Sequence, residues 1–250
     1  MDTINKIKRL GLSIFLITFI SVNVCLILSQ SFEFREHDVP SPGNYYGDLK
    51  IYNIGDAIAD KSSEWIIPYL DGTSSISRVV RVFPNNILFK ISMFVTGILL
   101  IRYWLLNKKL IEDLKIKETA TNKMIFFGIC SAIFLIIHSI FLGIKFDIAI
   151  YKLFRRIILL LFILMEITAQ FYLIKIFYKN KDLIEKFINI KILNIKKMLV
   201  YLLIIIAALI LPFLPFANLK ILKHALEWNY FLGVITFYLL TFFLWKKKLN

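Results

Sequence analysis

The sequence predicts an all-α polytopic membrane protein with six transmembrane helices and both termini in the cytoplasm. Of its 250 residues, 58% are hydrophobic, and they gather in six long runs. Each run has about the 20 residues that a helix needs to cross a hydrocarbon layer of about 30 Å. The chain carries 31 basic and 17 acidic residues, and lysines flank the apolar runs. This placement favours anionic lipid as a partner and argues against nucleic acid.

The six expected spans form a single membrane domain over residues 1–250, with no internal repeat. They cover residues 10–29, 86–106, 124–143, 157–178, 198–216 and 225–245. The first run is longer than the apolar part of a secretory signal and lacks a small-x-small cleavage site, so we expect it to stay as a span. Basic residues are more numerous in the connections on the side of the termini, which predicts that this side is cytoplasmic. The expected location is the inner membrane of a bacterium, or the Golgi, endoplasmic reticulum or endolysosomal membrane of a eukaryote.

The polar loop expected over residues 30–85 lies outside and ends in an amphipathic stretch. Its apolar residues recur at helical spacing and share one face: Ile76, Val79, Val80 and Phe83. Arg78 and Arg81 form a cationic row beside that face, and Thr73 or Ser74 is expected to cap the helix. We expect this helix to lie on the membrane, apolar side down, with its guanidinium groups free to bind lipid phosphate.

The sequence gives no expectation of a metal or a cofactor. Cys25 and Cys130 lie inside apolar runs, where they are interpreted as small buried hydrophobic residues. The acidic cluster at residues 33–38 contains one histidine and no cysteine at ligand spacing, so a solvated loop is the preferred interpretation.

Glu166 falls near the centre of the fourth span, where a lone acidic side chain costs roughly 2.5 to 3.5 kcal/mol. Three compensations are open: protonation, pairing with His138 of the third span, or a hydrogen bond with Gln170 one turn along the same helix. An interhelical hydrogen bond that fixes packing is favoured over proton transfer or contact with a lipid carbonyl.

His224, Glu227 and Trp228 share one face at the outer end of the sixth span. Trp228 is expected in the aromatic belt, while His224 and Glu227 could act as acid and base on a lipid ester. The residues expected to bind the lipid headgroup are Ser77, Arg78, Arg81, Arg155 and Arg156. The plainer alternative, in which all of these are interfacial anchors, is favoured because no nucleophile stands out.

Three short motifs follow one another along the chain: S-S-I-S-R at residues 74–78, the carboxylate of Glu166, and the pair Glu227–Trp228. In this order they resemble the six-span Frag/DRAM/Sfk family, which includes the damage-regulated autophagy modulators. The closest likeness is to the Golgi protein of GPI-anchor lipid remodelling, although the usual proline before S-I-S-R is replaced. The resemblance covers nearly the whole chain. It implies a multi-pass protein that affects lipid remodelling or the localisation of a lipid kinase.

Two functions of different classes are therefore expected. In the first, the protein binds an anionic or inositol-type headgroup at its outer face and takes part in lipid remodelling, with Glu166 and Glu227 orienting or protonating the lipid. In the second, it is a non-catalytic scaffold whose basic cytoplasmic loops recruit a protein partner or anionic lipid. A proton-coupled carrier that uses Glu166 and His138 is a third interpretation.

Overall fold

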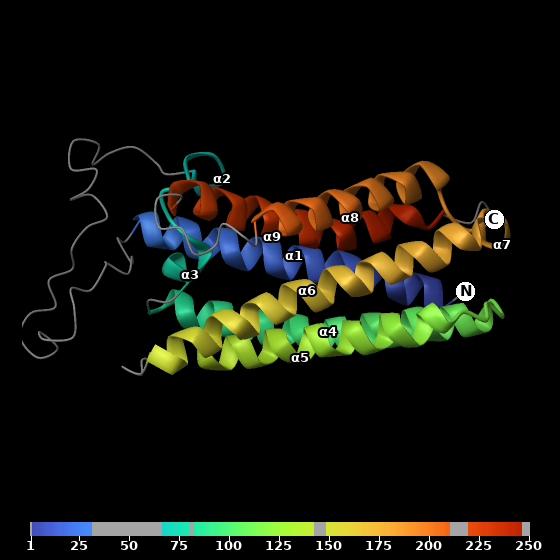
Figure 1. The fold of residues 1–250 in the computed structure, drawn as a ribbon, viewed down its shortest axis with the longest axis horizontal. Coiled ribbons are helices and arrows are strands. Elements are labelled where there is room, and N and C mark those ends of the chain that lie inside the picture. Colours follow the sequence, from blue (N-terminus) through green and yellow to red (C-terminus); the bar gives the residue numbers. More distant parts are fainter. Residues whose placement is uncertain (1, 32–66, 81–82, 143–148, 211–219, 247–250) are drawn as a thin grey trace, which may run out of the picture.

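The computed structural model describes residues 2–31, 67–80, 83–142, 149–210 and 220–246. Its long helices are α1 (Asp2–Ser31), α4 (Asn85–Asp113), α5 (Thr119–Phe141), α6 (Ala149–Lys179), α8 (Ile190–Ile210) and α9 (Lys220–Leu244) (Figure 1). Its short helices are α2 (Pro68–Asp71), α3 (Ile76–Val79) and α7 (Lys181–Ile184). Strand-like pairing within these residues is limited to one isolated bridge between Ile188 and Trp245. The prediction of an all-α protein is confirmed.

Six helices of the described chain are long and apolar enough to cross a membrane, as predicted. Each begins earlier in the chain than the predicted span, because the polar residues that flank an apolar run can continue the helix into the headgroup region. The largest difference concerns residues 179–197, which were expected to form a linker. Their second half belongs to α8, so Lys196 lies inside a span helix.

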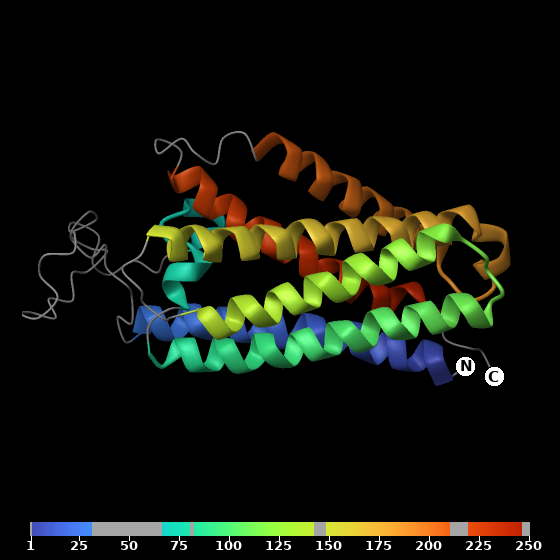
Figure 2. The same ribbon diagram turned by 60° about the horizontal axis from the view of Figure 1, so that its bottom comes forward.

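The six long helices form a closed ring that follows the order of the chain. Each packs on the next, from α1 through α4, α5, α6 and α8 to α9, and α9 packs back on α1. The start of α1 and the end of α9 lie at one end of the bundle beside α7, whereas α2 and α3 lie at the other (Figures 1 and 2). We call these the terminal end and the α3 end. Exposed apolar side chains such as Ile20, Ile91 and Leu202 cover the outside of the ring, as lipid contact requires.

The short helix α3 packs on the protein and not on the membrane. Three of its expected apolar face residues, Ile76, Val79 and Val80, are buried, and α3 contacts α1 and α9. Only Phe83 of that face is exposed, at 68%. The prediction of a membrane-lying helix is therefore wrong for α3, since neighbouring helices cover the apolar face that lipid was expected to cover.

The N-terminal cap of α3 also differs from the prediction. The backbone N–H of Arg78 donates to the Oγ of Ser75 at 3.3 Å, so Ser75 is the cap and not Thr73 or Ser74. Residues 32–66 and 81–82 of the predicted outer loop, which include the acidic cluster at 33–38 and Arg81, lie outside the described residues.

The contact between α4 and α5 depends on a glycine. Gly128 of α5 faces the ring of Trp104, and a Cβ built on this glycine would lie 2.5 Å from ring carbons. Trp104 is completely buried, so its ring has no free space to move into. A residue without a side chain therefore allows the two helices to approach this closely.

We expect Gly128→Ala to destabilise the bundle by about 1–3 kcal/mol, because overpacking forces a buried ring or a helix to shift. Thermal unfolding in detergent should show a lower midpoint. Gly233→Ala is the matched control, since its added methyl group would meet only the end of the Leu203 side chain, which can turn away. Equal midpoints for the two variants would contradict this account of the α4–α5 contact.

Candidate functional site

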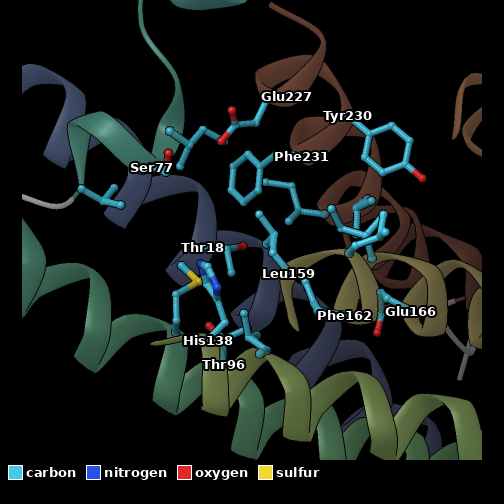
Figure 3. Close-up of a pocket in the computed structure, with 18 of the residues that line it drawn as sticks. Thr18, Ser77, Thr96, His138, Leu159, Phe162, Glu166, Glu227, Tyr230 and Phe231 are labelled. Carbon is cyan, nitrogen blue, oxygen red and sulfur yellow. The ribbon is translucent and has the colours of Figure 1, made fainter. Parts of the chain in front are cut away.

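A cavity of about 750 Å³ lies inside the ring, toward the α3 end (Figure 3). All six long helices and α3 contribute to its lining. Its volume falls within the range of about 300–1,000 Å³ that is usual for ligand pockets. Most lining side chains are apolar, so the cavity suits a hydrocarbon ligand, and polar lining residues are confined to a few positions.

Four polar side chains, three of them charged, gather at the α3 end of this cavity. They are Ser77 of α3, Arg156 of α6, and Lys223 and Glu227 of α9, and we call this set the charged rim. Figure 3 shows Ser77 and Glu227 at one end of the cavity, with Glu166 toward the other. The two cations outnumber the one carboxylate, so the rim favours an anionic group.

The structure brings together some of the predicted site residues and not others. Among the expected headgroup ligands, Ser77 and Arg156 line the cavity, whereas Arg78 and Arg155 do not. Of the candidate acid and base groups, Glu166, His138 and Glu227 line it. Sequence reasoning missed Lys223, although its i, i+4 spacing from Glu227 places it on the same face of α9.

His224 and Trp228 both contact the segment 67–80 and hold it against α9. The indole N–H of Trp228 donates to the Ser74 carbonyl at 2.7 Å, and Nδ1 of His224 lies 3.1 Å from the Gly72 carbonyl oxygen. Trp228 is completely buried. Its prediction as an aromatic-belt residue is therefore wrong: the indole faces a backbone carbonyl of the protein, not the lipid interface.

Two further contacts fix the same segment. Asn229 donates to the Tyr69 carbonyl at 2.7 Å, and the Tyr69 hydroxyl donates to the side-chain carbonyl oxygen of Asn23 at 3.2 Å. Burial raises the pKa of Tyr69, and its hydrogen bond with Asn23 partly offsets this. Gly72 has φ +61°, and a Cβ there would lie 2.1 Å from the Ile221 carbonyl oxygen, so only glycine fits. These contacts position Ser77 at the rim.

Glu166 is 1% exposed at the end of the cavity that faces the terminal end of the bundle. Ser131 donates to its Oε2 at 2.7 Å, and Gln170 donates to its Oε1 at 2.9 Å. The hydroxyl of Tyr238 also donates to Oε1. The predicted hydrogen bond with Gln170 is therefore present, and residues from three helices, α5, α6 and α9, meet at this carboxylate.

His138 lies elsewhere in the cavity. Figure 3 shows it beside Thr18 and Thr96, apart from Glu166. Along α5 it is about 10 Å from Ser131, which bonds Glu166. The hydroxyls of Thr18 and Thr96 donate to carbonyls of their own helices at 2.6 Å and 2.8 Å, so neither is aligned as a nucleophile that His138 would activate.

A second polar group lies between Glu166 and the terminal end. Lys196 is 1% exposed, and its Nζ donates to the Thr241 hydroxyl at 2.7 Å and lies 3.7 Å from the centre of the Phe237 ring. The hydroxyls of Thr241 and Tyr103 lie 3.0 Å apart. Sequence reasoning missed Lys196 because it was assigned to a linker. The signal was the absence of any Gly or Pro between 190 and the next apolar run.

The described residues contain no group of three or more His, Cys, Asp or Glu side chains that could hold a metal ion. In comparisons with known proteins, no family model, curated protein or solved structure matches the chain. The chemistry of the site therefore has to be inferred from its lining. The interior is apolar, the rim carries cations, and the imidazole of His138 lies partway along the cavity. At the far end, both carboxylate oxygens of Glu166 accept hydrogen bonds.

We expect Glu166→Gln to keep nearly the stability of the wild type, whereas Glu166→Leu should lose about 2–4 kcal/mol. The amide oxygen of the Gln variant can accept from Gln170 and Tyr238, and its NH₂ group can donate to Ser131, whose own hydrogen is shared with the Gly128 carbonyl at 2.9 Å. Leucine would leave these donors unpaired in an apolar interior. Thermal unfolding of both variants measures the difference. If both lose stability equally, the charge of Glu166 matters more than its hydrogen bonds.

Proposed function

We propose that the protein binds an anionic membrane lipid and takes part in remodelling it. The headgroup, which an inositol-type lipid would supply, lies at the charged rim, and an acyl chain lies in the cavity. The observation that carries this proposal is the combination of an apolar cavity of about 750 Å³ with cations at one end only. A polar group at one end of a hydrocarbon chain is the defining feature of a membrane lipid.

The rim has to supply most of the selectivity. A lipid chain gains little by moving from the bilayer into the cavity, because hydrocarbon surrounds it in both places. A cation close to the membrane surface contributes about 1 kcal/mol toward an anionic lipid. Arg156 is exposed, so its guanidinium group can reach a headgroup without first leaving a buried site.

Glu227 is the best placed residue for chemistry on the lipid. It lies at the rim, where an ester or phosphodiester of the headgroup region would be held, and a carboxylate there can act as a general base. The bonded hydroxyls of Thr18 and Thr96 favour water, or a hydroxyl of a second lipid, as the nucleophile. The resemblance to the lipid-remodelling family gives additional support, since Ser77, Glu166 and Glu227 of its motifs all line the cavity.

Arg156→Gln and Lys223→Gln should each weaken the binding of phosphatidylinositol about fivefold, which corresponds to the loss of about 1 kcal/mol. Binding is measured by native mass spectrometry of protein taken from vesicles that contain this lipid and a zwitterionic one. Lys191→Gln is the matched control, because it removes the same charge from the exposed start of α8, away from the rim. Equal weakening by all three variants would indicate a general charge effect and contradict a site at the rim.

The remodelling step is tested by the lipid profile of cells that lack the protein. We expect one anionic lipid class to change, wild-type protein to restore it, and Glu227→Gln to fail although it still binds lipid and unfolds at the wild-type temperature. Glu227→Asp, which keeps the carboxylate, should restore it in part. An unchanged lipid profile would contradict remodelling and favour the scaffold that acts through the basic terminal end.

A further inference from the structure

The cavity ends at one layer of side chains, to which five helices contribute one residue each. This floor layer consists of Ile14, Leu100, Leu135, Glu166 and Tyr238. One turn further toward the terminal end, five residues of α4, α5, α6 and α9 are buried at 2% exposure or less and do not line the cavity: Tyr103, Trp104, Ser131, Gln170 and Thr241. On these helices the cavity lining therefore ends at the floor layer.

Hydrogen bonds at the floor layer and on its terminal side hold the layer in place. Hydrogen bonds at Glu166 connect α5, α6 and α9. The contacts of Thr241 with Lys196 and Tyr103 connect α9 to α8 and α4. A ligand that pressed against this layer would have to break buried hydrogen bonds, each of which costs more than the contact with one extra methylene could return.

The distance from the rim to the floor layer follows from helix geometry. Arg156 and Glu166 are ten residues apart on α6, which corresponds to about 15 Å. Glu227 and Tyr238 are eleven residues apart on α9, which gives about 16 Å. An extended carbon chain advances about 1.2 Å per bond, so a chain that begins at the rim reaches the floor layer after about twelve carbons.

We propose that the floor layer sets the length of the acyl chain that the protein accepts. The cavity takes one chain of an anionic membrane lipid, and chains much longer than about twelve carbons bind less well because their ends meet the packed layer. This inference rests on the proposed function, and it adds a specificity that the charged rim cannot provide, since the rim contacts only the headgroup.

The test uses the full-length protein in vesicles of a zwitterionic lipid that also contain, in equal amounts, phosphatidylglycerols with lauroyl, myristoyl, palmitoyl and stearoyl chains. Native mass spectrometry of the extracted protein reports which lipid is bound. For the wild type we expect the lauroyl and myristoyl lipids to exceed the stearoyl lipid by at least about tenfold. Leu100→Phe should move the preference to shorter chains and Leu100→Ala to longer ones, by about two carbons each.

Leu135→Phe and Leu135→Ala repeat the test from α5, and Ile98→Phe is the control, because Ile98 is on α4 but 44% exposed on the outside of the ring. A folding defect would lower the binding of all chain lengths together, so it cannot produce opposite shifts at one position. The inference is overturned if bound chain lengths match those of the vesicle, or if neither pair of variants shifts them. Failure to bind any phosphatidylglycerol above a zwitterionic lipid would instead overturn the proposed function.

Discussion

The need to satisfy one carboxylate inside the membrane organises much of this bundle. Glu166 is buried in the middle of a span, where no water is available to replace a missing partner. Its donors come from three helices, so the ring has to close around it for the carboxylate to be satisfied. The same carboxylate ends the cavity. A single polar residue thus determines both how the helices meet and how deep the hollow part of the ring extends.

The two halves of the ring differ in how their interiors are packed. In the terminal half, buried aromatic rings such as Tyr103 and Trp104 pack beside the polar group of Lys196 and Thr241. The half toward α3 is hollow, and its shape depends on the segment 67–80, which the contacts of Trp228 and Gly72 hold on α9. A rigid half supports an open half, so the cavity keeps its depth while the rim stays accessible to charged groups.

The sequence predicts the features that depend on local pattern. Run length gave the six spans, and the i, i+4 spacing gave the Gln170–Glu166 bond. It could not predict contacts between residues far apart in the chain. The covering of α3 and the hydrogen bond from Trp228 to Ser74 depend on the segment 67–80 folding back on α9, which no local period encodes. Lys196 was missed because a lysine usually marks the end of a span. Here its ammonium group lies inside a span helix, where it contacts the Thr241 hydroxyl and the Phe237 ring.

The distribution of polar groups fits the proposed lipid site better than a path for protons or polar solutes. A carrier needs unbonded polar groups spaced along a route that water can enter. Here Thr241 of the terminal half bonds with Lys196 and Tyr103, and Thr18 and Thr96 in the cavity bond to their own helices. The remaining surface of the cavity is largely apolar. In the proposed function, a hydrocarbon chain occupies this space because it loses little on leaving the bilayer, and the cations at the rim bind its headgroup.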